Sequence, residues 1–161
     1  MSDEYESLVG RYLATKRSVL LSPQFLVNEV REGYSEKWEA WIDFLAIDLS
    51  KKGLQVWMVE VTGGSGRAIQ TKIEQFQYEY RPRIAAILDK YIALPAVSNR
   101  VESTGLPKSP AIGLWVFVTR EIIPKLARHA DTHITQCAYQ ATALEDIFLP
   151  GTYWERRFHE S

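Results

Sequence analysis

Two apolar runs joined by a short polar link limit the folds that are open to this chain. Residues 38–49 and 55–62 are rich in aromatic and branched side chains, and the link between them contains Ser50-Lys51-Lys52-Gly53. Aromatic and branched side chains suit the pleated surface of a sheet, and a polar link with glycine suits a chain reversal. The pattern therefore predicts an antiparallel β-hairpin over residues 38–62.

The hairpin also predicts which residues face one another. Pairing outward from the centre of the link, between Lys51 and Lys52, sets Asp43 directly across from Glu60 on the same face. Directly opposed β-carbons lie roughly 4.5–5.5 Å apart, and like charges there are destabilising. A slip of one residue would send one of the two acids to the other face, so the pairing depends on the turn.

Two carboxylates among apolar neighbours need a compensating charge. Burying an unpaired carboxylate is costly, and each carboxylate raises the pKa of the other unless a cation neutralises both. Magnesium typically binds one or two carboxylates together with waters and substrate phosphates, and such an ion activates water for phosphodiester hydrolysis. The alternative is that one carboxylate points to solvent, or pairs with a lysine or arginine.

Helical periodicity flanks the hairpin on both sides. Apolar residues at helical spacing predict a helix over residues 5–17 and a core-facing helix from Arg67 to Tyr91. Pro82 lies inside the second helix and predicts a kink or break near Tyr80-Arg81. A third helix is expected after residue 119, with Thr119 as its cap.

The remaining apolar segments predict strands. Residues 19–27 read as an irregular strand because Pro23 interrupts them, and the continuous apolar run 114–118 is typical of a strand buried on both faces. Residues 135–149 fit either a helix or a strand. We expect an α/β fold in which helices flank a mixed β-sheet, formed by one domain over residues 1–161.

Composition excludes several classes of protein. With 161 residues and a single cysteine, Cys137, the chain cannot form an intramolecular disulfide or a zinc site of several thiolates. The formal net charge of −1 means that any nucleic-acid contact needs a local basic patch. No apolar run is long enough to span a bilayer, and the acidic N-terminus has no signal core, so we expect a cytoplasmic protein. The candidates for the basic patch are Arg67, Arg81, Arg83 and Arg100.

The hairpin sequence resembles the core of the PD-(D/E)xK nuclease superfamily, the restriction endonuclease-like proteins. The resemblance lies in WIDFLAID at residues 41–48, a lysine-glycine turn, and VWMVEVT at residues 56–62. It implies an αβββαβ core, DNA phosphodiester hydrolysis and a Mg²⁺ or Mn²⁺ cofactor bound by Asp43 and Glu60. It also implies that Glu6, on the first helix, completes the site.

The chain departs from the family pattern at one position. Thr62 occupies the place of the motif lysine, and a threonine cannot supply a cation. In some members the lysine lies on the following helix, and Lys72 is the candidate here. We expect the Val61 carbonyl to add a metal ligand, and Gln75 and Arg67 to contact the substrate. Thr62 also leaves open a catalytically inactive relative that binds nucleic acid or a protein, and a homodimer is conceivable because many members are dimers.

Other residues are interpreted as structural. Gly63-Gly64-Ser65-Gly66 lacks the spacing of a phosphate-binding Walker loop and is taken as a turn between a strand and a helix. His129 and His133 have i, i+4 spacing without a zincin glutamate, so we interpret them as surface residues after a helix. Cys137 is expected to be a small buried residue. Near the C-terminus, Trp154 with Arg156 and Arg157 is the surface candidate for base stacking.

Overall fold

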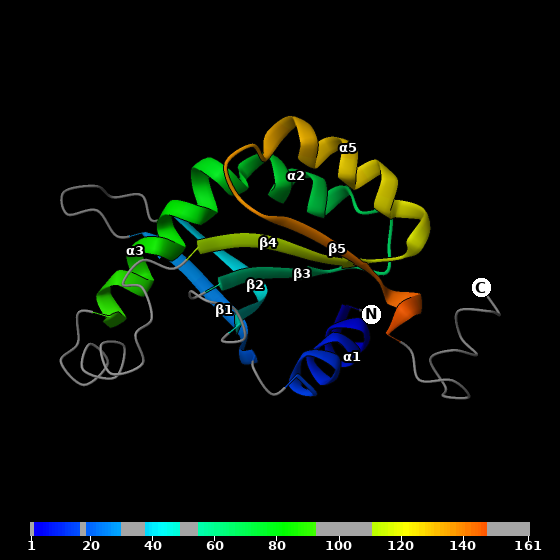
Figure 1. Cartoon of the computed structure of the whole chain (residues 1–161), viewed down its shortest axis with the longest axis horizontal. Coiled ribbons are helices and arrows are strands. Elements are labelled where there is room, and N and C mark those ends of the chain that lie inside the picture. Colours follow the sequence, from blue (N-terminus) through cyan, green and yellow to red (C-terminus); the bar gives the residue numbers. More distant parts are fainter. Residues whose placement is uncertain (1, 17–18, 30–37, 49–54, 93–110, 148–161) are drawn as a thin grey trace.

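Five strands form one mixed sheet whose order in space, β1-β2-β3-β4-β5, follows their order in the chain (Figure 1). The computed structural model describes residues 2–16, 19–29, 38–48, 55–92 and 111–147. β1–β2 and β2–β3 are antiparallel, whereas β3–β4 and β4–β5 are parallel. The strands are β1 (Val19–Glu29), β2 (Trp38–Asp48), β3 (Gln55–Val61), β4 (Ala111–Val118) and β5 (Tyr139–Ala143).

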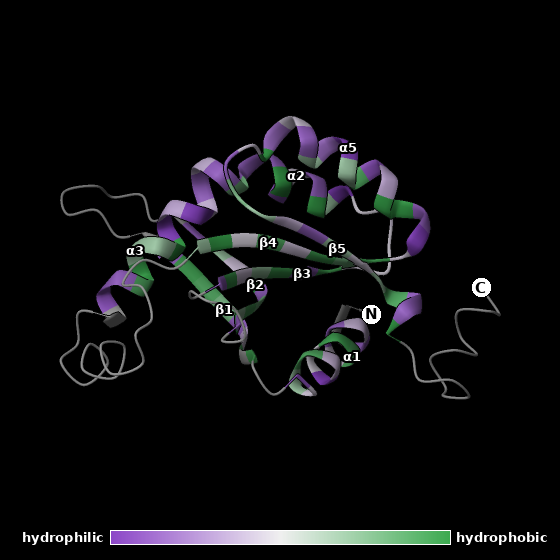
Figure 2. Cartoon of the chain, in the orientation of Figure 1, coloured by the Kyte–Doolittle hydropathy of each residue, from purple (hydrophilic) through white to green (hydrophobic). Residues whose placement is uncertain are grey.

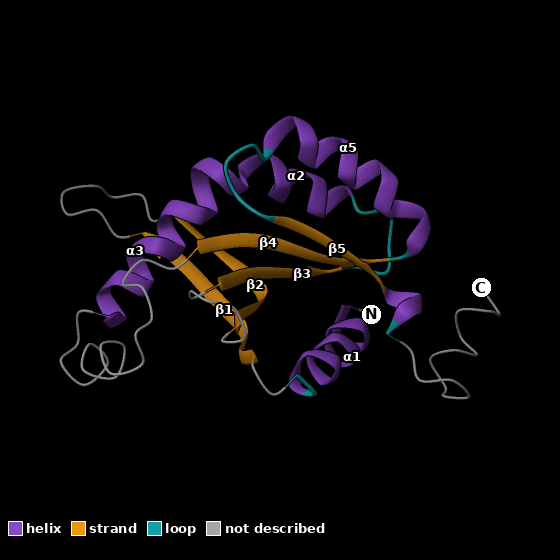
Figure 3. Cartoon of the chain, in the orientation of Figure 1, coloured by secondary structure: helices purple, strands orange, loops and turns teal. Residues whose placement is uncertain are grey.

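Helices lie on both faces of the sheet (Figures 1 and 3). One face is covered by α1 (Ser2–Ala14), and the other by α2 (Arg67–Gln75), α3 (Arg81–Ile92) and α5 (Ile123–His133). A parallel strand pair needs a crossover connection, which α2 and α3 provide between β3 and β4 and α5 provides between β4 and β5. Three short helical segments complete the described chain: η1 (Phe76–Tyr80), η2 (Arg120–Ile122) and η3 (Leu144–Asp146).

Each face of the sheet carries its own apolar cluster. Along β3, Val56 and Met58 join the cluster under α2, α3 and α5, whereas Trp57, Val59 and Val61 join the cluster against α1. Both faces are therefore buried, which explains why β3 and β4 are nearly continuous apolar runs. Figure 2 shows the same pattern, with hydrophobic colour along these strands and hydrophilic colour on the outer sides of the helices. The predicted α/β class, with a mixed sheet between helices, is confirmed.

The hairpin and its register are confirmed. β2 and β3 pair in the predicted alignment from Phe44 opposite Val59 to Asp48 opposite Gln55, and this ladder ends one position before Asp43 and Glu60. The turn itself, within residues 49–54, lies outside the described residues. Branched and aromatic residues make up most of this ladder, and the two acids lie beyond its last pair.

The predicted break near Tyr80-Arg81 is also confirmed, and it takes the form of a π-helix. Phe76–Tyr80 is π-helical and ends where α3 begins at Arg81. Pro82 has no N–H to donate and its ring crowds the carbonyl four residues earlier, so the regular hydrogen-bond ladder cannot pass this point. The wider π turn accommodates that mismatch.

Two sequence interpretations are corrected by the structure. Thr119 precedes η2, but its buried hydroxyl caps no helix and has no hydrogen-bond partner within the described part of the chain. His129 and His133 do not follow a helix; they belong to α5 and are half-buried. The ambiguous segment resolves into β5 and η3.

Several predictions concern parts of the chain that the structure does not describe. Arg100 and the tail residues Trp154, Arg156 and Arg157 lie outside the described residues.

Irregularity in β1 is confirmed, because the strand continues through Pro23 but Gln24 has a φ of 48°. None of the helices in the described ranges has the length and hydropathy that a membrane crossing requires.

Candidate active site

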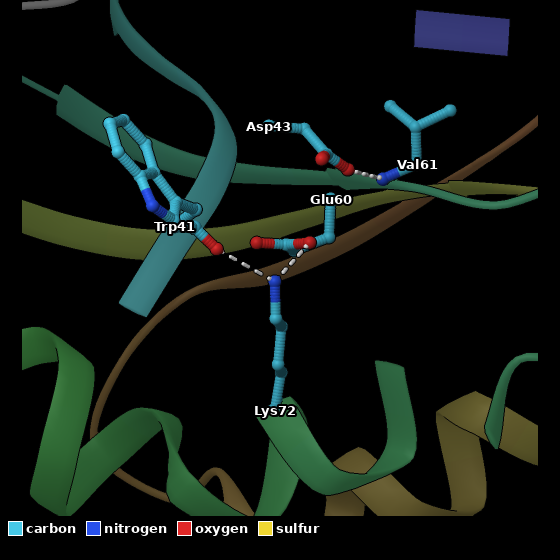
Figure 4. A network of polar contacts seen from close by, with 5 residues as sticks. All are labelled: Trp41, Asp43, Glu60, Val61 and Lys72. Atoms are coloured by element: carbon cyan, nitrogen blue, oxygen red, sulfur yellow. Dashed lines mark hydrogen bonds and ion pairs between the residues drawn. The ribbon is translucent and has the colours of Figure 1, made fainter. Parts of the chain in front are cut away.

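The candidate site forms where the pairing of β2 and β3 ends. Beyond the pair Phe44–Val59, the Asp43 side chain takes over from the backbone ladder: its Oδ2 accepts a hydrogen bond from the Val61 amide at 2.7 Å (Figure 4). β2 is irregular here, because Ile42 and Leu45 both join the same apolar cluster and strict alternation would put them on opposite faces. This irregularity leaves the Asp43 carboxylate beside β3.

Glu60 is a buried acid with one satisfied and one unsatisfied oxygen. The residue is 3% exposed, and its Oε2 accepts a hydrogen bond from Lys72 Nζ at 2.8 Å. Its Oε1 is buried and has no hydrogen-bond partner among the residues that the structure describes. Most buried polar atoms in proteins are hydrogen-bonded, so an orphaned carboxyl oxygen marks this residue for a functional explanation.

The surroundings of Glu60 favour its protonated form. Burial raises the pKa of Glu60 to about 8, although the Lys72 ammonium acts to lower it; the Asp43 carboxylate adds to the rise. Desolvation disfavours the charged carboxylate more than one cation can compensate. A protonated Glu60 still accepts the Lys72 hydrogen bond through its carbonyl-type oxygen.

Lys72 reaches the site from α2. Ile69, Ile73 and Phe76 bury one side of this helical segment against the sheet, and Lys72 lies at the margin of that stripe. Its Nζ donates to Glu60 Oε2 and, at 3.1 Å, to the carbonyl oxygen of Trp41 (Figure 4). The side chain is 22% exposed, so it spans from solvent to the buried acid. Lys72, the candidate on the following helix, thus lies within hydrogen-bond distance of Glu60.

Glu6 lies near Asp43 along two open hollows. The larger hollow, about 400 Å³, and the smaller, about 290 Å³, share Glu6, Gln24 and Asp43 in their walls. Trp41, which is 62% exposed, lines the smaller one. Glu60 and Lys72 do not line either hollow. α1 thus brings Glu6 to the Asp43 side of the site.

The other predicted residues lie around this centre without joining it. Arg67 and Gln75 are exposed on α2, at its two ends, outside the network in Figure 4. Val61 contributes its amide to Asp43, whereas the prediction concerned its carbonyl. Thr62 has a structural part: its amide donates to the Phe117 carbonyl at 3.0 Å, and its hydroxyl accepts from the Gly64 amide at 3.1 Å.

The described arginines of the predicted basic patch differ in their surroundings. Arg83 forms an ion pair with Glu79 on the same helical segment, which offsets its charge. Arg81 is half-buried, and Arg67 is exposed at the start of α2.

Sequence reasoning missed two features of this region. The Trp41 carbonyl as a partner of Lys72 has no signature, because every residue has a carbonyl. The second feature is a group of Glu74, His129 and His133, whose potential ligand atoms all lie within 4.8 Å of one another. The i, i+4 spacing of the two histidines was a visible signal, but the glutamate comes from another helix.

Fold and site together define an α/β protein that carries a buried carboxyl–ammonium pair and a second carboxylate at the end of two adjacent strands. Comparisons of the chain with models of known families, with curated proteins and with solved structures find no match. Oxygen donors with one orphaned carboxyl atom fit a hard divalent cation such as Mg²⁺ or Mn²⁺. The chemistry of the site therefore follows from its own donor set.

Proposed function

We propose that this protein is a divalent-metal-dependent DNA endonuclease of the PD-(D/E)xK type, with a restriction endonuclease-like core. One observation carries the proposal: Lys72 Nζ lies 2.8 Å from Glu60 although the motif position holds Thr62. A lysine from the next helix supplies the cation that the strand lacks. The order of elements, α1, three strands, α2 with α3, then β4, supports the same proposal.

Asp43 and Glu60 are the residues that would hold the ion, with the Val61 carbonyl and Glu6 as further oxygen donors. Mg²⁺ or Mn²⁺ would supply Lewis-acid stabilisation of negative charge on a phosphodiester and a more acidic bound water. The orphaned Glu60 Oε1 supports this assignment, because a cation would satisfy it. Replacing the proton of Glu60 by such an ion also removes the cost of a buried negative charge.

Lys72 would act on the reacting groups through a fixed ammonium. Its two hydrogen bonds, to Glu60 and to the Trp41 carbonyl, restrain the end of an otherwise flexible side chain. A positioned cation orients the attacking water and stabilises the charge that develops on the phosphate. The exposed Trp41 ring beside the Asp43 hollow would offer a stacking surface to an unpaired base. Arg67 and Gln75 would contact substrate phosphates from α2.

A cleavage assay tests this proposal. Purified protein is incubated with plasmid, branched and single-stranded DNA in Mg²⁺, Mn²⁺ or EDTA. We expect cleavage that requires the ion and falls by about 10²-fold or more in Asp43→Ala and in Glu60→Ala, because each removes a donor that acts in the transition state. Glu121→Ala, which removes an exposed acid from η2, is the matched control and should cleave like the wild type.

Two results would reject the assignment. One is cleavage by Asp43→Ala and Glu60→Ala at the wild-type rate, which would trace the activity to another site or to a contaminant. The other is wild-type protein that neither cleaves any of the substrates nor binds Mn²⁺ in calorimetry.

The second candidate is a catalytically inactive relative that binds nucleic acid or a protein partner. Thr62 favours it, because Lys72 would have to replace a motif residue from a different element. This candidate predicts DNA binding in a gel-shift assay without cleavage, unchanged by Asp43→Ala. Metal binding that depends on Asp43 would favour the nuclease over the catalytically inactive relative.

A further inference from the structure

A second group of metal-ligating side chains lies between α2 and α5. Glu74 belongs to α2, and His129 and His133 belong to α5. His129 Nε2 lies 2.9 Å from Glu74 Oε1, and the two imidazole rings have their centroids 4.7 Å apart. Both histidines are half-buried, so their positions are set by packing as well as by solvent. Three potential ligands thus converge from two helices.

The chemistry of this group differs from that of the Asp43–Glu60 site. Residues four apart on a helix lie on the same side of it, so two histidines at this spacing present nitrogens to one point. Two imidazoles and one carboxylate form the donor set of many zinc sites that keep a fourth position open. Imidazole favours Zn²⁺ and its neighbours in the transition series, whereas Mg²⁺ prefers oxygen donors.

The distances are compatible with an ion after small side-chain adjustments. All ligand atoms lie within 4.8 Å of one another, and tetrahedral Zn²⁺ with bonds of about 2.0–2.1 Å requires separations of roughly 3.4 Å. The Glu74–His129 pair is already closer than that, so the main adjustment falls on the His133 ring. The plain alternative is a hydrogen bond between His129 and Glu74 beside a second histidine.

We propose that Glu74, His129 and His133 form a transition-metal site, with Zn²⁺ as its ion, that ties α2 to α5. The site is independent of the proposed nuclease function, since it shares no residue with the Asp43–Glu60 pair. It bears on α2 as a whole, because Glu74 and Lys72 belong to the same helix. An ion bound here would hold the helix that carries Lys72.

Metal titration of the full chain tests the site. Zn²⁺ binding is measured by calorimetry and thermal shift, and Co²⁺ is used as a probe because tetrahedral Co²⁺ gives visible absorption bands. We expect one ion per chain, a higher melting temperature, and loss of about 10- to 100-fold or more in affinity in Glu74→Gln, His129→Gln and His133→Gln. The controls are His159→Ala and Cys137→Ser, which remove the other imidazole and the thiol, and Asp43→Asn, which alters the carboxylate site.

The possible outcomes separate cleanly. Binding that is lost in the three variants and kept in the three controls supports the site, and binding that is lost only in Asp43→Asn overturns it. Absence of Zn²⁺ binding by the wild type also overturns it. Should a histidine variant fail to fold, side-chain NMR of the wild type still decides: Zn²⁺ must shift the imidazole signals of two of the three histidines, and no shift contradicts the proposal. Mn²⁺-dependent cleavage is scored separately, so either proposal can fail alone.

Discussion

Glu60 and Gln77 are both polar and both almost fully buried, at 3% and 6% exposure, yet their hydrogen bonding differs sharply. Gln77 lies in the π-helix, and its Oε1 accepts from the amides of Thr135 at 2.9 Å and Gln136 at 3.2 Å. Its Nε2 also lies 3.4 Å from the Thr135 hydroxyl. Glu60 accepts from Lys72 on Oε2 and has the Asp43 carboxylate beside it, but among the described residues its Oε1 has no hydrogen-bond partner.

The difference separates a structural polar group from a candidate functional one. Gln77 satisfies the backbone where α5 turns toward β5, so it contributes to stability in the way that most buried polar groups do. Glu60 carries a desolvation cost that its contacts only partly offset, and such costs are common where function requires them. Removing each side chain should therefore have opposite consequences for folding and for activity.

The largest expected effect is on cleavage in Lys72→Met. Methionine keeps much of the apolar stem but lacks the ammonium, so transition-state stabilisation is lost while packing is retained. We expect Mn²⁺-dependent cleavage to fall by about 10²–10³-fold, the range for removal of one preorganised donor. Initial rates on plasmid DNA measure it, with Lys90→Met, an exposed lysine on α3, as the matched control. Equal cleavage rates in Lys72→Met and the wild type would show that the Lys72 ammonium takes no part in catalysis.

The next effect is a pH dependence of stability that is specific to Glu60. In EDTA, the unfolded chain releases this proton near its ordinary pKa of 4.5, whereas the folded chain keeps it until about pH 8. The native state therefore binds more protons between these values, and the free energy of unfolding falls as pH rises, by up to about 1.4 kcal/mol per pH unit. Besides burial, the groups that act on the pKa of Glu60 are Lys72 on α2 and Asp43 on β2.

Urea unfolding from pH 5 to 8 measures this dependence. Glu60→Gln has no proton to release and should lose the Glu60 contribution to the slope, so that its stability relative to the wild type increases with pH. The exposed Glu121→Gln serves as the control and should follow the wild-type curve. If Glu60→Gln and the wild type run parallel, Glu60 ionises in the folded chain as it does in the unfolded one.

A third, smaller effect concerns Gln77→Ala. This change removes the acceptor of two part-buried backbone amides, those of Thr135 and Gln136. Each buried donor left without an acceptor costs about 1–3 kcal/mol, less whatever a water molecule or a local backbone shift restores. We expect a loss of about 2–3 kcal/mol in the free energy of unfolding, with cleavage activity per folded molecule unchanged. Gln75→Ala removes an exposed glutamine two residues earlier and should change stability by about 0.5 kcal/mol or less. Similar losses of stability in the two variants would mean that the hydrogen bonds of Gln77 do not stabilise the fold in solution.

The two acids of the candidate site can be predicted from the sequence, but the surroundings of each acid cannot. The branched and aromatic strands predict the alignment from Phe44–Val59 to Asp48–Gln55, but the irregularity of β2 beyond that ladder, where Asp43 accepts from the Val61 amide, has no local signal. The burial of Glu60 depends on β4 and α2, which pack on β3 from distant parts of the chain. That Lys72 reaches Glu60 was predicted only through the family resemblance, because helical spacing places it on a helix margin without saying what lies opposite.

Gln77 and the histidine group show the same limit in another form. Regular helical spacing predicts that Gln77 is exposed, but the π-helix turns its side chain inward. The π-helix in turn lies just before Pro82, five residues after Gln77. Glu74 and His129 are 55 residues apart in the chain, so only the packing of α2 on α5 makes them neighbours. Local propensities can be predicted from the sequence, whereas contacts between residues far apart in the chain cannot.

The smallest expected effect tests how rigidly the chain presents Lys72 to Glu60. Gly66 begins α2 with a φ of 78°, and a β-carbon there would lie 2.9 Å from Ile122 Cγ2. A left-handed conformation costs about 1–2 kcal/mol for a residue with a side chain, so Gly66→Ala should lose about that much stability. Gly64→Ala is the matched control, since its β-carbon would meet only the Thr62 hydroxyl at 3.6 Å. Chemical denaturation measures both.

The same variant distinguishes a tightly placed lysine from a loosely placed one. Gly66 lies six residues before Lys72, so a backbone adjustment at Gly66 that relieves the clash with Ile122 shifts the start of the helix that carries the ammonium. If the short Lys72–Glu60 contact is required for cleavage, Gly66→Ala should lower the rate by more than its loss of folded protein explains, and Gly64→Ala should not. A rate that falls only in proportion to the folded fraction would show that Lys72 tolerates displacement, and that the contrast between Glu60 and Gln77 concerns stability alone.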